Sequence, residues 1–228
     1  MVIDTKDNVL LFHQQILNDP NHRYRSWEHC YSHFQRRCSF NSKDDIDTAS
    51  LHLAFYLASW GMYRGSSRLL QKDYKVHIPT VRELLDDRYT SLWQLDFDSI
   101  DSGSPEIELL FQLVGKLGQI YKKVNVSPTD TLITKILLGT LCCTPAYDQW
   151  FVNGVKVWKR YKKPNQKFPA SFGRNSYLGL IEFYRQNTKG LNAAQAIIAQ
   201  CGITYPVMKL VDMYFWNLGY QEAQNKRT

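Results

Sequence analysis

Apolar residues recur at intervals of three and four positions through most of this 228-residue chain, which is the spacing of one face of an α-helix. In residues 105–123 this pattern follows a proline, Pro105, a residue that favours the first turn of a helix. No two alternating, strand-like runs are joined by a tight turn. We therefore expect an all-α fold of about ten helices, with a chain long enough to bury a large core.

Prolines, glycines and capping residues set the expected helix boundaries. We expect helices at residues 6–18, 22–37, 44–63, 79–87, 105–123, 127–141, 145–161, 172–186, 190–201 and 206–221, with residues 88–104 irregular. The expected organisation is a single compact unit, residues 1–228, made of two lobes with a cleft between them. A six-helix lobe takes about 43–143, and the second lobe takes about 1–42 plus 144–228.

Positive charge is concentrated in one stretch of the chain. Residues 149–211 contain ten Lys and Arg but only one acidic residue, Glu182, so this stretch carries +9, the remainder carries −2, and the total is +7. Such a concentration is typical of a surface that binds phosphates. A basic face that only keeps the protein in solution is the alternative interpretation.

Cysteine usage and the N-terminus do not indicate secretion. The five cysteines are an odd number with no Cys-x-x-Cys pair, and Cys142 and Cys143 lie in an apolar run, so we expect buried thiols. Residues 1–7 are mixed in charge, and the longest apolar run, 53–62, is too short to span a bilayer. We expect a cytoplasmic monomer with no membrane partner, metal or cofactor.

A single carboxylate, Asp148, stands at the head of the basic stretch. One interpretation makes Thr144 an N-cap and Pro145 the first helical residue, which leaves Asp148 in the first turn, where the helix dipole favours an acid. The other interpretation is catalytic. Breaking the bond between a base and its sugar builds positive charge on the sugar, and an ionised carboxylate stabilises that charge. Both interpretations remain open.

The run from Val126 to Asp148, VSPTDTLITKILLGTLCCTPAYD, resembles the end of the helix-hairpin-helix region of DNA glycosylases. In that family a helical stretch leads through a short turn to an essential aspartate, which would fall on Asp148. The glycine-rich hairpin signature is replaced here by Ser127-Pro128-Thr129. The position of the lysine of lyase-type members falls near Thr129, and no four-cysteine pattern for an iron–sulfur cluster follows.

The resemblance implies an enzyme that binds DNA, rotates one nucleotide out of the helix and hydrolyses its N-glycosidic bond. The base would be a modified one, and antiviral defence against phage DNA is one role found in the family. The residues expected to form its base pocket are Trp60, Tyr63, Arg64 and Tyr147. A core helix with Trp60 and Tyr63 packed inward is the alternative for the first of these segments.

Cations alternate with aromatic residues between positions 156 and 174. Lysines and arginines at this density contact phosphates, and aromatics between them stack on exposed bases. The residues expected to bind nucleic acid are Lys156, Lys159, Arg160, Lys162, Lys163, Lys167 and Arg174, with Trp158, Tyr161, Phe168 and Phe172 as the aromatics.

Two further interpretations stay open. A helical protein that binds DNA or RNA without chemistry needs Asp148 only as a helix cap, and a helical adaptor would use the basic face for an acidic protein. His29 and His33 have the spacing of metal ligands but lack the His-Glu-x-x-His pattern. A packed aromatic helix containing Trp27, Tyr31 and Phe34 accounts for them better.

Overall fold

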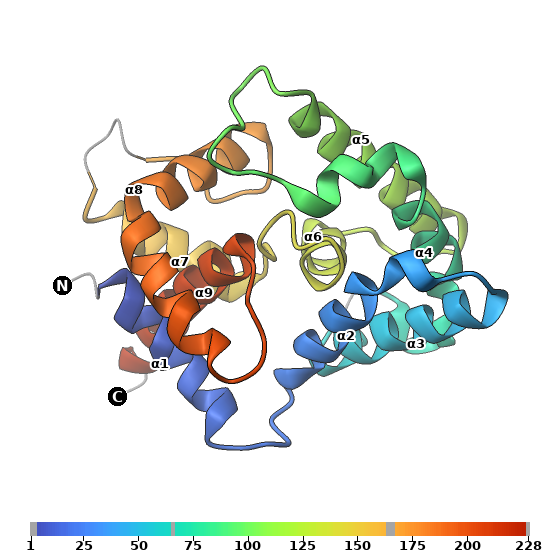
Figure 1. Cartoon of the computed structure of the whole chain (residues 1–228), viewed down its shortest axis with the longest axis horizontal. Coiled ribbons are helices and arrows are strands. Elements are labelled where there is room, and N and C mark those ends of the chain that lie inside the picture. The colour runs from blue at the N-terminus through green and yellow to red at the C-terminus, as the bar shows by residue number, and fades with distance from the viewer. Residues whose placement is uncertain (1–3, 65–66, 163–166, 227–228) are drawn as a thin grey trace. The chain divides into compact units, whose positions relative to one another are not determined.

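The computed structural model describes residues 4–64, 67–162 and 167–226, and every regular element within these ranges is a helix, which confirms the all-α fold (Figure 1). Its α-helices are α1 (Thr5–Leu17), α2 (Arg25–Gln35), α3 (Lys43–Ser59), α4 (Ile78–Leu84), α5 (Pro105–Lys123), α6 (Asp130–Gly139), α7 (Gln149–Lys159), α8 (Arg174–Ala199) and α9 (Val207–Asn225). Four short 3-10 helices are η1 (Arg37–Ser39), η2 (Leu69–Gln71), η3 (Tyr74–His77) and η4 (Asp87–Gln94). No helix among the described residues is both long and apolar enough to cross a membrane.

The chain divides into two compact units. Unit 1 comprises Met1–Pro20, Asp96–Ser102 and Thr144–Thr228, and unit 2 comprises Asn21–Leu95 and Gly103–Cys143. Helix α2 therefore belongs with the middle of the chain, and the short segment Asp96–Ser102 belongs with the C-terminal part, which differs from the expected lobes.

Both differences have a visible cause. In α2, Trp27 is 1% exposed and its indole N–H donates to the carbonyl of Leu138 in unit 2, at 2.9 Å. The segment Asp96–Ser102 is fastened to α8 by Arg185, whose guanidinium donates to the carbonyl oxygens of Phe97, Asp98 and Ile100. The sequence pattern shows none of these contacts, because each joins residues far apart in the chain.

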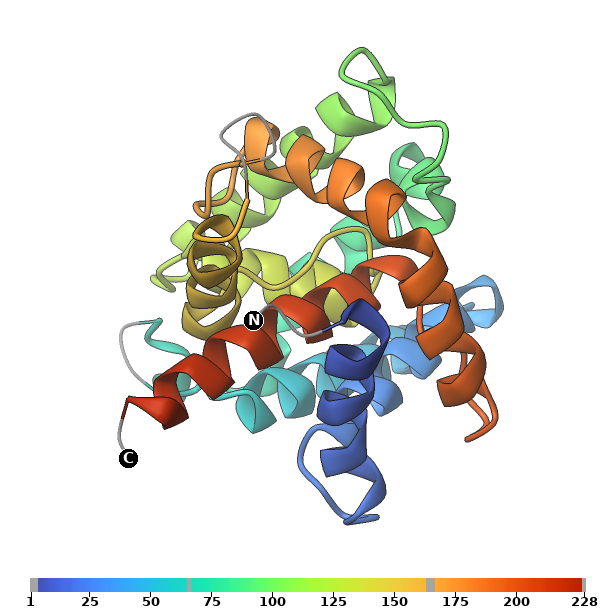
Figure 2. The same ribbon diagram turned by 90° about the vertical axis from the view of Figure 1, so that its left-hand side faces the viewer.

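Unit 1 is built around α9, which packs against α7 and α1; Figure 2 shows the red α9 close to the blue α1. Two glycines bring α7 and α9 into backbone contact. A Cβ on Gly154 would come within 1.8 Å of the carbonyl oxygen of Phe215, and a Cβ on Gly219 within 2.0 Å of that of Trp150. Only glycine fits at these positions, and its lack of a side chain lets the backbones of α7 and α9 pack in direct contact.

Helix α8 is one element of 26 residues, where the sequence predicts two helices separated near Gly190. Glycine lowers helix propensity but does not end a helix that tertiary packing supports. A Cβ on Gly190 would lie 3.2 Å from Thr5 at the start of α1, so the glycine serves the packing of α1 against α8.

In unit 2 the core includes the apolar face of α5. In α5 the buried residues follow helical spacing, namely Ile107, Leu110, Leu113, Leu117 and Tyr121. Helix α3 begins with a capping box, in which Ser42 and Asp45 satisfy each other's backbone N–H groups. The 3-10 helix η4 lies where the sequence predicts irregular chain. A 3-10 helix has three residues per turn, so its residues do not repeat at the α-helical spacing that guided the prediction.

Candidate functional site

Asp148 is the N-cap of α7. Its Oδ1 accepts hydrogen bonds from the backbone N–H groups of Trp150 at 3.0 Å and Phe151 at 3.1 Å, and the residue is partly exposed. The expectation that Thr144 caps the helix and Pro145 begins it is wrong, because α7 begins at Gln149 and residues 144–148 are not helical. An Asp at this position satisfies backbone N–H groups of the first turn that have no partner within the helix.

The non-helical segment before Asp148 is fixed by a buried ion pair. The N–H of Ala146 donates to Oδ1 of Asp212 at 3.0 Å, and Oδ2 of Asp212 lies 3.3 Å from Nζ of Lys209. Both charged side chains are 2% exposed, and the Lys209 ammonium also lies over the ring of Phe12. Burying two charges is costly unless they are paired and hydrogen-bonded, so this arrangement ties α9 to the segment that carries Asp148.

Tyr147 is a core residue of unit 1. It is 3% exposed, its hydroxyl lies 2.8 Å from Oγ of Ser176, and its ring packs against Phe151 and Phe172. The structure therefore gives it a packing role next to Asp148, where the resemblance implies a wall for a base.

The other three residues expected in a base pocket, Trp60, Tyr63 and Arg64, belong to unit 2. Trp60 follows the last residue of α3 and is half-buried. Tyr24 stacks on its indole at a centroid distance of 4.5 Å, and the ammonium of the buried Lys135 lies 4.9 Å from the ring centroid. Tyr24 and Lys135 thus pack against the ring of Trp60, which the sequence analysis expects to stack on a base. Arg64 is exposed.

Tyr63 begins a chain of hydrogen bonds that leads into the core of unit 2. Its hydroxyl lies 2.9 Å from Nε2 of His77, and Nδ1 of His77 lies 2.6 Å from the hydroxyl of Tyr121. His77 is fully buried, and burial lowers its pKa to about 4. A neutral imidazole donates from one ring nitrogen and accepts at the other, so His77 fits between two hydroxyl groups and fixes the direction of the Tyr63 hydroxyl.

Several of the cations expected to bind phosphate are engaged within the protein. Arg160 pairs with Glu222 at 2.7 Å, and Arg174 donates to the carbonyl of Ser102 at 3.1 Å. Lys209, counted in the basic stretch, is buried. These three contribute less free positive charge to the surface than the sequence suggests.

Four other lysines between residues 156 and 167 are accessible to solvent. Lys156 and Lys167 are exposed, Lys159 and Lys162 are partly exposed, and in the described part of the chain no ion pair joins any of the four to an acid. Lys163 lies outside the described residues. The lysines on and after the last turn of α7 are therefore solvent-accessible cations of unit 1.

The aromatic residues of this stretch mostly form core. Trp158 is 2% exposed and Phe168 6%, Phe172 is partly exposed, and Tyr161, at 57%, is the one largely exposed ring of the four. The expectation that aromatics alternate with cations on one open surface is wrong. The aromatics pack inward while the lysines stay outside, as an amphipathic helix requires.

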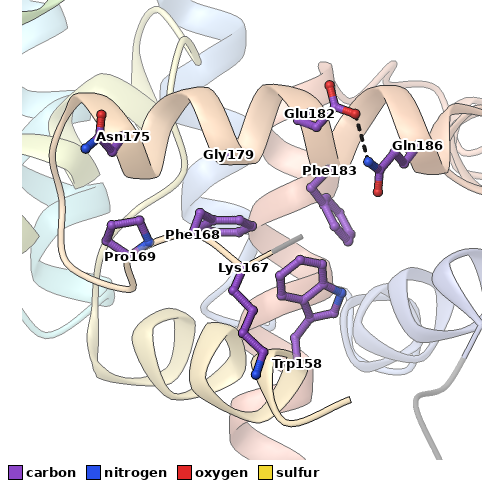
Figure 3. Close-up of a pocket in the computed structure, with 9 residues that line it drawn as sticks. All are labelled: Trp158, Lys167, Phe168, Pro169, Asn175, Gly179, Glu182, Phe183 and Gln186. Carbon is purple, nitrogen blue, oxygen red and sulfur yellow. Dashed lines mark hydrogen bonds between the residues drawn. The ribbon is translucent and has the colours of Figure 1, made fainter. Parts of the chain in front are cut away.

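A pocket of about 650 Å³ lies between α7, the segment after residue 166 and α8, entirely within unit 1. Figure 3 shows the rings of Trp158, Phe168 and Phe183 between the two helices and Asn175, Glu182 and Gln186 spaced along α8. The sequence pattern does not predict this pocket, because its walls come from segments up to 28 positions apart.

Four buried polar residues, Lys135, Lys209, Asp212 and His77, are not predicted from the sequence. For three of them the sequence does contain an indication, namely a charged residue within an apolar helical run. Lys135 lies within the apolar run Leu132–Leu138, and Lys209 and Asp212 lie three apart in an apolar helix, where a charge is unexpected unless it is paired. Among the residues that the structure describes, no group of three His, Cys, Asp or Glu side chains could hold a metal ion.

No protein-family model, curated protein or solved structure matches this chain.

Proposed function

We propose that this protein is a monofunctional DNA glycosylase in which Asp148 is the catalytic carboxylate. The observation that carries the proposal is the placement of Asp148, a partly exposed acid fixed at the start of α7 by two backbone hydrogen bonds. The preceding segment is held by the buried Asp212, so the carboxylate is preorganised. Preorganised charge is what stabilises a developing cation without a cost of rearrangement.

The proposed reaction is a hydrolysis. The C1′–N bond breaks with its electrons moving to the base, and positive charge builds on the sugar. The ionised Asp148 stabilises that charge and orients a water molecule. The water oxygen then bonds to C1′ while its proton leaves with the base, so the products are a free base and an abasic site.

The lysines near the end of α7 support binding to DNA. Lys156 lies eight residues beyond Asp148 and Lys159 eleven, which at the rise of a helix is about 12 and about 16 Å along its axis. Because each strand carries a charge about every 3.4 Å, such distances correspond to phosphates about four to five positions away from the target nucleotide. Contacts of this kind position a strand without reading its sequence.

The test is Asp148→Asn. Asparagine caps a helix about as well as aspartate, so the fold stays intact while the charge is removed. We expect the release of base to fall by about 10²-fold or more, measured as alkali-labile sites in DNAs that carry a panel of modified bases. Circular dichroism checks the fold, and full activity in the variant would refute the catalytic role.

A second candidate is a DNA- or RNA-binding protein without catalytic activity. It is favoured by the two N-cap bonds of Asp148, which give the carboxylate a complete structural role. Here Asp148→Asn leaves binding and stability nearly unchanged, and no base is released by either form. The lysines of α7 then carry the function alone.

Binding through these lysines is tested by salt dependence. Removing Lys156 and Lys159 together should reduce the slope of log K against log salt by roughly 0.7 to 0.9 for each phosphate that is no longer neutralised. The matched control is Lys122→Ala with Lys123→Ala, two exposed lysines of α5 in unit 2. An equal change of slope in both pairs of variants would mean that the charge is not used locally.

A further inference from the structure

The pocket between α7 and α8 has an aromatic floor. The ring of Trp158 lies 5.1 Å from that of Phe168 and 5.7 Å from that of Phe183, as centroid distances. Gly179 allows this arrangement, because a Cβ there would come within 2.3 Å of the Cβ of Phe168. The Phe168 ring is thereby seated directly against α8. The volume of about 650 Å³ is that of a site for a small organic molecule.

One face of α8 supplies a polar rim. Asn175, Gly179, Glu182 and Gln186 are spaced by four, three and four residues, so they follow one side of the helix. The side-chain amide of Gln186 donates to Oε1 of Glu182 at 2.7 Å. This bond leaves Oε2 of Glu182 and the amide oxygen of Gln186 as acceptors, which matches a ligand that carries amino groups.

Lysines stand at the edges of the pocket. Lys167 lines it and is exposed, and the ammonium of Lys162 lies 5.3 Å from the centroid of the Trp158 ring. Glu182 is the one acid between residues 149 and 211. An apolar floor of mutually inclined rings, with interplanar angles of 40° and 82°, lies beside acceptors on one rim and cations at the edge. Together they match the apolar ring, the amino group and the phosphate of a nucleotide.

We propose that this pocket binds one unstacked nucleotide whose base carries an exocyclic amino group, with cytosine the best fit. A carboxylate accepts a hydrogen bond from N4 of cytosine, whereas thymine presents a carbonyl oxygen at the same place. Trp158 is ten residues beyond Asp148 on α7, about 15 Å along the axis, so this nucleotide is not the one at Asp148. The inference rests on the proposed binding of nucleic acid but not on chemistry at Asp148.

The experiment measures the affinity of the full chain for fluorescently labelled ten-nucleotide strands of deoxycytidine and of thymidine. We expect the wild type to bind the cytosine strand about fivefold to tenfold more tightly, as one base contact allows. Glu182→Gln should bring that ratio close to one. Lys167→Ala should weaken both strands about equally, because a phosphate contact carries no base preference.

Two controls match these changes in charge. Asp87→Asn and Lys122→Ala alter exposed residues of unit 2 and should leave the ratio unchanged. Asp148→Asn should also leave it unchanged, which separates this site from the proposed catalytic one. Gln186→Ala is a second pocket variant, expected to lower the ratio because it removes an acceptor.

Deoxycytidine monophosphate, added alone, identifies the source of the nucleotide. Binding that depends on Lys167 and Glu182 with the mononucleotide, but not with the strand, assigns the pocket to a free nucleotide. The same dependence with the strand assigns it to DNA. The pocket variants could leave the affinity for both ligands unchanged, while the double variant Lys156→Ala with Lys159→Ala weakens strand binding. In that case the pocket proposal fails and the proposed binding surface on α7 stands. If nothing binds, both fail.

Discussion

Each of the two units buries a hydrogen-bonded polar group beside its candidate residue, and the two groups differ in kind. Unit 1 holds the ion pair of Lys209 and Asp212, each 2% exposed. Unit 2 holds the neutral imidazole of His77 between the hydroxyls of Tyr63 and Tyr121. An ion pair depends on the presence of both partners, whereas a neutral imidazole depends on the pH of the solution.

The difference shows how each unit fixes its candidate site. The segment before Asp148 is held by a buried ion pair, which requires both Lys209 and Asp212 to be present. The hydroxyl of Tyr63 is held by a histidine that takes up a proton in acid. The following predictions test whether this contrast is real.

The largest effect is expected from breaking the ion pair. Asp212→Ala leaves the Lys209 ammonium buried without its carboxylate and removes the acceptor of the Ala146 N–H. We expect a loss of about 3–5 kcal/mol in the free energy of unfolding, measured by urea denaturation. Replacing both partners, Lys209→Met with Asp212→Leu, should cost less than the single change. A double variant that is less stable than the single one would contradict this account.

The second-largest effect is expected on the free energy of unfolding when the pH is lowered. The folded pKa of His77, about 4, lies below its ordinary value of 6.5, so the unfolded chain binds the proton first. The free energy of unfolding should therefore fall as the pH is lowered from 6.5 towards 4, by about 3 kcal/mol from this group. The His77→Gln variant should lose that share of the pH dependence, as seen in urea denaturation across this range. His33, whose pKa burial also lowers to about 4, contributes in the same window.

A smaller contrast comes from two glycines. A Cβ on Gly154 in unit 1 would strike the backbone of Phe215, which cannot move, whereas a Cβ on Gly139 in unit 2 would strike the ring of Tyr56. We expect Gly154→Ala to destabilise by at least the 1–3 kcal/mol typical of overpacking and Gly139→Ala by less. Thermal unfolding of the two variants compares them. The reverse order would mean that α7 and α9 can separate more easily than their packing suggests.

The helical fold was predictable because it rests on local spacing. The expected helix at residues 105–123 has the same bounds as α5, since Pro105 begins it and the apolar residues repeat regularly. The break expected near Gly190 was wrong, because packing against α1 outweighs the low propensity of one glycine. The start of α7 was wrong because Pro145 suits a helix start but also suits an extended segment.

The candidate site was predictable only in part. Charge counting identified the lysines of α7, but it also counted Lys209 and Arg185, which the fold uses internally. The hydrogen bond between Asp212 and Ala146 joins residues 66 positions apart, and the bond between His77 and Tyr121 joins residues 44 positions apart. No local sequence pattern predicts contacts over such separations. The pocket on α8 depends in the same way on how segments meet.

The fastening of residues 96–102 by Arg185 has a consequence for dissection of the protein. The backbone passes from unit 1 to unit 2, returns for these few residues, leaves again and comes back after Cys143. Neither unit is therefore formed by one continuous stretch of sequence. Any single truncation of the chain that is meant to isolate one unit also removes residues that belong to it. Limited proteolysis followed by purification should yield nicked, associated pieces and no autonomous half.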